Sequence, residues 1–295
     1  MNEFKNYHPF VNFIYFLAVI AFSMFFMNPV CLFISFISGF IYSVMLNGKK
    51  ALKFNLVYLL PLMIISAFIN PAFNHEGVTI LTYLPSGNPL TLESIIYGIA
   101  AACMIACIIC HFSCFNIIMT SDKFVYLFGK IIPSMSLILS MVLRFVPRFK
   151  EQIKIISNAQ KCIGCDISDG NIIKRAKNGI KILSIMITWS LENSIETADS
   201  MKSRGYGLPG RTAYSNFVFD KRDAFALAAI VFFSLFVIIG AGTGNLYFRY
   251  FPSIKTVNIT PYGVSVMAAY FLLFICPVII EIKEAWRWKK SQSKI

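Results

Sequence analysis

Six apolar stretches, each close to the length of a membrane crossing, most constrain what this chain can fold into. They span residues 10–27, 30–46, 54–70, 92–113, 223–243 and 262–281. A helix needs about 20 mainly apolar residues to cross the hydrocarbon core of a bilayer. Of the 295 residues 57% are hydrophobic and only 14% are charged, so a soluble globule of this size would lack a polar surface. The sequence therefore predicts an all-α integral membrane protein with about six transmembrane helices.

The placement of lysine and arginine predicts how these helices are oriented. Of the 27 basic residues, 25 fall on one predicted side, in the segments 1–9, 47–53, 114–222 and 282–295. The loops on the other side, 71–91 and 244–261, hold the remaining two. Cytoplasmic loops carry the excess of basic residues, so we expect cytoplasmic N- and C-termini in a multi-pass protein of the plasma (cell) membrane. In a chain this apolar, the net charge of +13 favours contact with the anionic lipid of the bilayer over nucleic acid.

The interiors of the six stretches hold no charged residue. Glu93, Asp223 and Glu281 lie at their ends, where a side chain can reach the interface. Carriers that couple transport to ions usually need ionisable groups or interrupted helices at the midplane. The sequence therefore favours a membrane scaffold over a pump with its own coupling site.

The long basic segment between the fourth and fifth stretches divides the chain into three parts. Residues 1–113 hold transmembrane helices 1–4, residues 114–222 form a cytoplasmic region, and residues 223–295 hold helices 5–6 and a basic C-terminal tail. Within the cytoplasmic region, the segment 131–143 is too short to span the bilayer but apolar enough to dip into it.

Apolar residues recur every three or four positions in two parts of the cytoplasmic region, which predicts a pair of long amphipathic helices. The first stripe is Leu139, Val142, Phe145 or Val146, Phe149, Ile153 and Ile156; the second is Ile180, Leu183, Ile187, Leu191, Ile195, Ala198 and Met201. Two interpretations are open. Each helix packs on its neighbour, or it lies in the membrane interface and presents its apolar side to lipid or to a second membrane protein. Both can hold at once.

The two predicted helices end alike. The first closes with AQKCIG (159–164) and the second with ADSMKSRG (198–205). A glycine just past the last turn is typical of a helix C-cap, and a cation there interacts favourably with the helix dipole. Taken alone, Arg204-Gly205 predicts a simple helix stop.

The wider runs around these ends resemble a known family. LRFVPRFKEQIKIISNAQKCIG (143–164), WSLENSIETADSMKSRGYGLPGRT (189–212) and the opening HPFVNFIYFLAVIAF (8–22) are similar to the transmembrane T component of energy-coupling factor (ECF) transporters. The resemblance implies that the amphipathic pair are coupling helices, whose Ala-Arg-Gly-type ends dock into grooves on two cytoplasmic ABC ATPase subunits. It also implies a separate, membrane-embedded substrate-binding subunit as a partner.

The resemblance assigns roles to particular residues. The ATPase-docking residues it implies are Ala159, Gln160, Gly164, Met201, Ser203, Arg204 and Gly205; those that support the coupling helices are Arg144, Pro147, Glu192, Glu196 and Asp199. The second motif reads Ser203-Arg204-Gly205, a mild change from the family pattern. The first reads Cys162-Ile163-Gly164 and lacks the arginine, so a charge contact is not implied at that end.

The function expected from the resemblance is that of a scaffold. It would transmit ATP hydrolysis by its partners to the uptake of a vitamin or of a transition-metal ion such as cobalt or nickel. The chain contains no G-x-x-x-x-G-K-[ST] sequence, so we expect that it is not itself an enzyme, needs no cofactor and relies on partner ATPases. The alternative is an integral-membrane enzyme whose basic region binds an anionic lipid or phosphate substrate, which would need convergent acid and base groups.

Other motifs are interpreted as structural. The row Cys103, Cys107, Cys110 and Cys114 with His111 indicates helix packing, since one helix face cannot complete a tetrahedral metal site. Cys162 and Cys165 form a CxxC without a second pair, which leaves a redox role as an alternative. The glycines of GYGLPG (205–210) follow a helix instead of a strand, which argues against a dinucleotide site. Glu192, Glu196 and Asp199 are interpreted as surface charge, with salt bridges to the ATPases as the alternative. His75 and Glu76 have no identifiable partner.

Overall fold

The computed structural model describes residues 3–83, 87–129, 133–166, 168, 170–208, 217–256 and 260–292. The chain divides into two compact units. The first, here called the bundle, comprises residues 1–123 and 217–295; the second, here called the helix pair, comprises residues 124–216. The predicted division of the chain into the parts 1–113, 114–222 and 223–295 stays a prediction.

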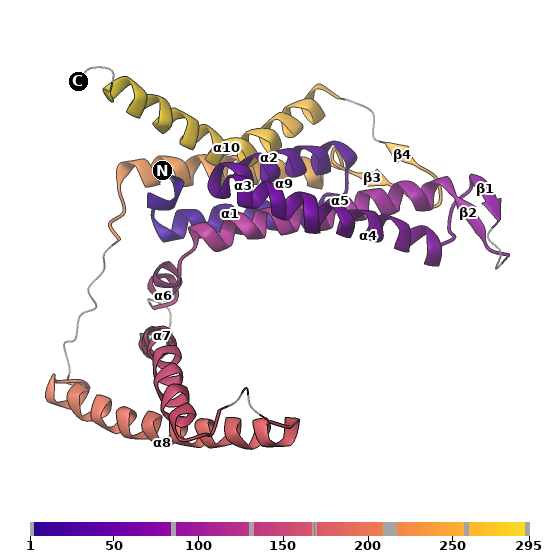
Figure 1. Ribbon diagram of the computed structural model, residues 1–295. Coiled ribbons are helices and arrows are strands. Elements are labelled where there is room, and N and C mark those ends of the chain that lie inside the picture. The colour runs from indigo at the N-terminus through magenta and orange to yellow at the C-terminus, as the bar shows by residue number, and fades with distance from the viewer. Residues whose placement is uncertain are drawn as a thin grey trace. The chain divides into compact units, whose positions relative to one another are not determined.

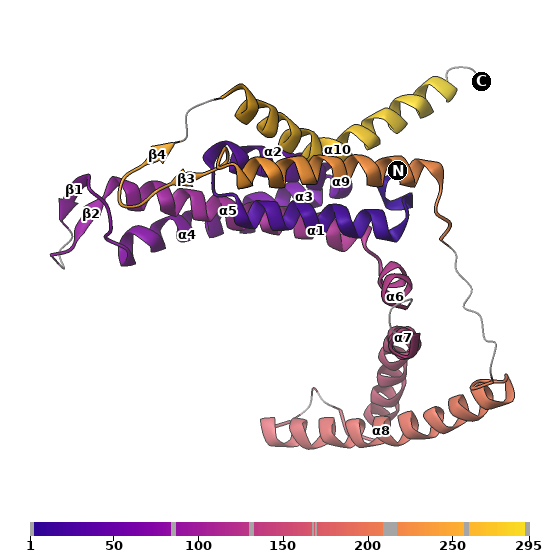
Figure 2. The same ribbon diagram turned by 180° about the vertical axis from the view of Figure 1, so that it is seen from behind.

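Helices build the bundle, and two short hairpins lie at one of its ends. Its elements are η1 (Phe4–Asn6), α1 (Pro9–Phe25), α2 (Pro29–Asn47), α3 (Lys49–Phe54), η2 (Asn55–Leu59), α4 (Leu60–Phe73), β1 (Ile80–Tyr83), β2 (Pro89–Thr91), α5 (Leu92–Ile118), the start of α6 (Ser121–Gly129), α9 (Lys221–Gly242), β3 (Phe248–Arg249), β4 (Lys255–Thr256) and α10 (Pro261–Gln292). β1 pairs with β2 and β3 with β4, both antiparallel. Both hairpins lie at the end of the bundle opposite the N-terminus (Figures 1 and 2).

Five helices of the described chain are long and apolar enough to cross a membrane. They are Pro29–Asn47, Lys49–Phe73, Leu92–Ile118, Lys221–Gly242 and Pro261–Arg287. α1 is also apolar but shorter, with 17 residues. The predicted all-α membrane protein is confirmed, whereas a total of six spans stays a prediction.

Aromatic side chains fill the centre of the bundle. Those that are fully buried include Phe4, Tyr15, Phe16, Tyr42, Tyr270 and Phe274. α10 bends near its middle, where Pro277 lacks the N–H that a regular helix needs (Figure 1). The hydroxyls of Tyr15 and Ser38 both donate to the Phe274 carbonyl at 3.1 Å. α1 and α2 therefore supply polar contacts beside the bend.

The cysteine row of α5 packs against α2. Cys107, Cys110 and Cys114 are buried, as is His111. The Cys107 thiol donates to the Leu32 carbonyl at 3.5 Å, and His111 Nε2 lies 3.2 Å from the Ser35 carbonyl oxygen. No group of three or more His, Cys, Asp and Glu side chains in the described segments is arranged to hold a metal ion. Close packing of two helices accounts for the positions of these residues.

The acidic residues at the ends of the predicted spans are buried. Glu93, Asp223 and Glu281 are 3%, 2% and 7% exposed, so these side chains do not use the access to the interface that a span end offers. Each carboxylate instead accepts backbone N–H groups of a neighbouring segment: Thr79 for Glu93, His8 for Asp223, and Glu3 and Phe4 for Glu281. These donors replace water, which makes burial of the charges tolerable.

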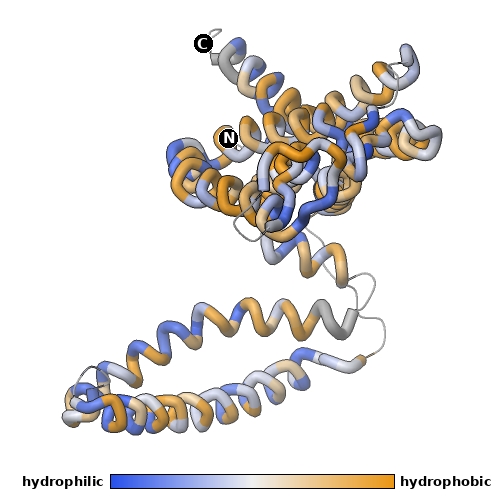
Figure 3. Tube along the Cα trace, turned by 90° about the vertical axis from the view of Figure 1, so that its right-hand side faces the viewer, coloured by the Kyte–Doolittle hydropathy of each residue, from blue (hydrophilic) through white to orange (hydrophobic). Residues whose placement is uncertain are grey.

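The second unit is built from two long helices, α7 (Pro133–Cys162) and α8 (Ile172–Ser203). Polar and apolar residues alternate along both helices, as the periodicity predicts (Figure 3). The two helices meet through a small cluster, Phe149 and Ile156 from α7 and Ile182, Met186 and Trp189 from α8. Residues 133–143, most of the short apolar segment 131–143, form the first turns of α7. Residues 131 and 132 lie outside the described chain.

Most of the apolar stripe predicted on the second helix does not pack against α7. Its members Ile180, Leu183, Ile187, Leu191 and Ile195 are 53–67% exposed. The face of α8 that meets α7 is instead formed by Ile182, Met186 and Trp189. Of the two interpretations, packing on the neighbouring helix is therefore wrong for these five residues. The interpretation in which this side faces lipid or a second membrane protein stays a prediction.

Candidate functional site at the ends of two helices

α7 ends in a hydrogen-bonded turn around Gly164. The Gly164 N–H donates to the Lys161 carbonyl at 3.1 Å, and the Cys165 N–H reaches back to the Gln160 carbonyl at 2.9 Å. This pair of bonds is the Schellman motif, which needs a residue with positive φ, and Gly164 has a φ of 76°. Ile163 is therefore the capping residue, and its side chain is 64% exposed.

α8 ends in the same turn. The Gly205 N–H donates to the Lys202 carbonyl and the Tyr206 N–H to the Met201 carbonyl, both at 3.0 Å. Gly205 has a φ of 80°, and Arg204 is the capping residue. Both ends thus have the C-cap that their sequences predict. Arg204 and Ile163 occupy equivalent positions on two ends of the same backbone shape.

The turn that follows α7 is fastened to α8. The Asp166 carboxylate accepts the Ser168 hydroxyl at 2.6 Å and pairs with Lys161 at 3.2 Å. These hydrogen bonds, chiefly those from Ser168, lower the pKa of Asp166 to about 2. The buried Asn178 of α8 donates from Nδ2 to the Asp166 carbonyl at 2.8 Å. The first helix end is therefore held in a defined position on the second helix.

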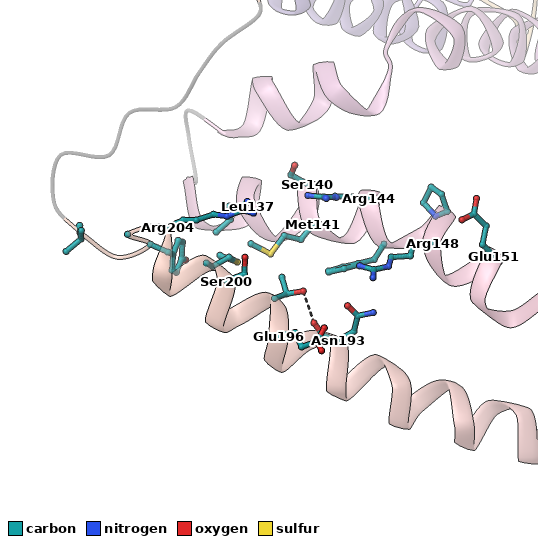
Figure 4. Close-up of a pocket in the computed structure, with 17 residues that line it drawn as sticks. Leu137, Ser140, Met141, Arg144, Arg148, Glu151, Asn193, Glu196, Ser200 and Arg204 are labelled. Carbon is teal, nitrogen blue, oxygen red and sulfur yellow. Dashed lines mark hydrogen bonds between the residues drawn. The ribbon is translucent and has the colours of Figure 1, made fainter. Parts of the chain in front are cut away.

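A cleft of about 1190 Å³ opens between the first half of α7 and the last turns of α8 (Figure 4). Arg144, Arg148 and Glu151 line it from α7. Glu196 and Arg204 line it from α8. Arg148 also lies over the Trp189 ring, 5.6 Å from its centre, which adds a cation–π contact to the junction of the helices.

The three arginines of the cleft are not neutralised within the described chain. Neither ion pair found there, Lys161–Asp166 or Arg287–Glu284, includes any of them. Arg144, Arg148 and Arg204 are all exposed. A guanidinium group presents a planar fork of donors that matches a carboxylate or a phosphate. The cleft can therefore offer such forks to an acidic partner.

The structure brings part of the predicted residue set together. Arg144, Pro147, Glu196, Met201, Arg204 and Gly205 line the cleft. Glu192 and Asp199 are exposed on α8 and do not line it, and the Ser203 hydroxyl donates to the Ser200 carbonyl at 2.9 Å. Ala159, Gln160 and Gly164 belong to the separate end of α7. The docking and supporting roles assigned to these residues stay predictions.

Sequence reasoning missed the residues that fix the two helices to each other. Asn178 lies just before the α8 stripe and Trp189 between two of its positions, and the sequence patterns assigned a role to neither. The polar asparagine within a helical pattern was the available signal, because a buried side-chain amide needs a hydrogen-bond partner. Its partner, the Asp166 carbonyl, cannot be read from spacing.

The remaining motifs are the CxxC, His75 and the GYGLPG run. Cys162 is exposed and Cys165 half-buried, with Lys181 Nζ 3.8 Å from the Cys165 sulfur. His75 has a partner after all, the Asn88 amide at 3.1 Å. The last two residues of GYGLPG, 209 and 210, lie outside the described residues, as do 211 and 212 of the longer run.

Comparison with known proteins gives consistent results. The family model CbiQ, described as cobalt transport protein, matches residues 4–214. Three proteins called energy-coupling factor transporter transmembrane protein EcfT are similar to this chain. The protein of Lactococcus lactis is 35% identical over 106 residues, 36% of this chain and 40% of that protein. The Lactobacillus helveticus protein is 40% identical over 101 residues, 34% and 36% of the two chains. The protein of Acidaminococcus fermentans is 38% identical over 106 residues, 36% and 39%. The chain therefore spans about 40% of the length of these relatives.

Proposed function

Because this chain belongs to the CbiQ family, we propose that it is the membrane-embedded coupling subunit, or T component, of an ECF-type importer. The family match and the EcfT relatives confirm the resemblance of this chain to T components. In the proposed complex, two cytoplasmic ABC ATPases bind the ends of α7 and α8. The chain passes their motion to a separate substrate-binding membrane subunit.

The observation that carries this proposal is the shared geometry of the two helix ends. Each is a rigid Schellman turn with an exposed residue at the cap, Ile163 or Arg204. The glycine that follows has no side chain to block close approach of a partner. A guanidinium on a fixed helix end can pair with partner carboxylates with little loss of freedom. Two such ends, on helices fixed to each other by the contacts around Trp189 and Asn178, suit a part that takes up motion from two subunits at once.

The exposed stripe of α8 supports the second proposed partnership. Leu191 and Ile195 are 62% and 65% exposed, and the preceding stripe residues Ile180, Leu183 and Ile187 are exposed to a similar degree. A continuous apolar side on an otherwise polar helix marks contact with a membrane or with another protein. We therefore assign this side to the substrate-binding subunit and to surrounding lipid. Changing Leu191 to Asn should weaken capture of that subunit while the ATPases still co-purify.

The same proposal includes location and substrate class. We propose that the chain lies in the plasma membrane, as its apolar spans support, and that both termini are cytoplasmic. The excess of basic residues in 1–9, 47–53, 114–222 and 282–295 supports this orientation. The family description names cobalt; we propose a transition-metal ion or a vitamin as the transported substrate. Selection among them would rest with the substrate-binding subunit.

Co-purification in detergent tests the proposal. The chain, carrying an affinity tag, is expressed with the ABC ATPase pair and the substrate-binding subunit of its own organism. The complex is then captured through that tag. We expect both ATPases in the eluate, and ATP-dependent substrate uptake after reconstitution. A chain that elutes alone, or that converts a lipid or phosphate substrate by itself, would favour the membrane enzyme instead. The transport proteins among its relatives favour the coupling role.

A further inference from the structure

The segment that precedes α1 is anchored to the bundle through its backbone. The N–H groups of Glu3 and Phe4 both donate to the Glu281 carboxylate of α10 at 3.1 Å. Phe4 is fully buried, and Glu281 is only 7% exposed. Residues 3–8, here called the N-terminal segment, are therefore held by a buried charge and by the aromatic core.

The same segment holds the point where the chain leaves the bundle. Lys123, at the start of α6, is the last residue of the bundle before the helix pair begins. It is 4% exposed, and its ammonium group donates to the carbonyls of Lys5 and Tyr7, the latter at 3.4 Å. Turned with its oxygen towards Lys123, the Asn12 amide accepts from Nζ at 2.7 Å and donates to the Phe4 carbonyl at 3.1 Å.

The segment also holds the point where the chain returns. Residue 217 is the first residue of the bundle after the helix pair, and α9 starts shortly afterwards. The His8 N–H donates to Asp223 at 3.2 Å, and the second Asp223 oxygen accepts the Asp220 N–H at 3.1 Å. The Arg222 guanidinium lies over the Tyr7 ring, 4.3 Å from its centre. Asp223 is only 2% exposed.

We propose that the N-terminal segment ties the exit and the return of the chain to each other and to α10, so that Lys123, Asp223 and Glu281 are positioning residues for coupling. The proposal rests on the proposed function. Two covalent connections join the helix pair to the bundle, one after Lys123 and one before Lys221, and a displacement of the helix pair can pass along them. If each connection could move independently of the bundle, a displacement of the helix pair would shift the connections without moving the membrane helices. The segment bonds to both, because Lys5 and Tyr7 bind the exit and His8 binds the return.

A purely stabilising role makes a different prediction. If these residues only stabilise the fold, replacing them would lower the yield or the melting temperature in proportion to the hydrogen bonds lost. Complexes that still assemble would then transport normally. A positioning role changes the ratio of substrate transported to ATP hydrolysed in complexes that are fully assembled. That ratio is therefore the decisive quantity.

The test uses the complete reconstituted complex with Lys123→Met, Asp223→Asn and Glu281→Gln. We expect each variant to retain both ATPases and their hydrolysis, while uptake per ATP falls about tenfold or more. Lys123→Arg should recover most of the loss, since a guanidinium also donates to carbonyls. Asn6→Ala, an exposed change in the same segment, and Lys50→Met, an exposed basic residue of α3, are controls and should behave as wild type.

The outcomes separate this inference from the proposed function. A wild-type chain that binds no ATPase would defeat the proposed function itself. A wild type that is coupled, with the same uptake per ATP in the three variants, would overturn the positioning role alone. If Lys123→Met yields no complex, the near-isosteric Asp223→Asn and Glu281→Gln decide, and an unchanged ratio in both refutes the proposal.

Discussion

Reversing the charge of Arg204 tests whether the end of α8 makes a charged contact with an ATPase. Arg204 is exposed and forms no ion pair with any carboxylate in the described residues, so its loss breaks none there. A cation at a helix C-terminus is worth about 0.3–1 kcal/mol. That value is the largest loss of stability expected for the chain itself in Arg204→Ala.

A partly buried charge contact with a partner is worth more. Removing one member of such a pair costs roughly 2–5 kcal/mol, which corresponds to an affinity loss of roughly 30- to 4000-fold at 1.4 kcal/mol per tenfold. Arg204→Glu places like charges together and should lose at least as much. Arg204→Lys keeps the charge without the planar fork, so it should be intermediate.

The assay measures membrane level, co-purified ATPase subunits and substrate uptake for the wild type and the Ala, Lys and Glu variants. We expect equal membrane levels, with ATPase binding or uptake lost in Arg204→Glu. Lys177→Glu, a charge reversal at an exposed position near the start of α8, is the matched control and should retain both. Full assembly and full uptake in Arg204→Glu would refute the reasoning and leave Arg204-Gly205 as an ordinary helix stop.

Three further predictions follow from charge and capping. In a cysteine-free chain, Asn74→Cys should be labelled by an impermeant thiol reagent in intact cells, and Lys177→Cys only after permeabilisation. Labelling of Lys177→Cys in sealed cells would contradict the predicted orientation. Ile163→Arg should keep or strengthen ATPase binding, because it adds a donor fork to an end that already has the right shape; release of an ATPase subunit in pull-down would show an apolar pocket there. Burial, with repulsion from Lys5, lowers the pKa of Lys123 from 10.5 to about 8, so the unfolded chain binds this proton more tightly and stability rises with pH between these values. The melting temperature of the wild type should therefore rise from pH 7.5 to 9 relative to Lys123→Met, and a parallel course of the two would contradict the burial of a charged Lys123.

Local pattern was sufficient to predict the long helices and the C-terminal ends of α7 and α8. Apolar runs of about 20 residues identify the spans because the bilayer fixes their length. The 3.6-residue period identifies α7 and α8, and the glycines at 164 and 205 identify both C-caps, because these depend on neighbours within a few positions. Each of these features is local in the chain.

The faces of the helices and the partners of buried charges could not be predicted in the same way. α8 has apolar residues on two sides, and periodicity does not indicate which side meets α7. In the structure Ile182 and Met186, which are not part of the regular stripe, pack against α7. Glu281 and Asp223 sit at span ends, where exposure is the usual expectation. Their backbone partners, Phe4 and His8, lie more than 200 positions away in the sequence, so no spacing indicates them.

The two helix ends present one backbone shape with two different side chains, and this difference has a consequence for docking. A groove that fits the Schellman turn can bind both ends through shape, whereas Arg204 adds a charge contact that Ile163 cannot. Salt screens contacts between charges, with a Debye length that falls from about 10 Å at 0.1 M to about 3 Å at 1 M, and leaves apolar contact in place. We therefore expect the ATPase at the end of α8 to dissociate from the purified complex at lower salt than the one at the end of α7. The ratio of the two ATPase subunits retained on a column, measured across a salt gradient, tests this. If both leave together, the cap residue does not distinguish the two sites.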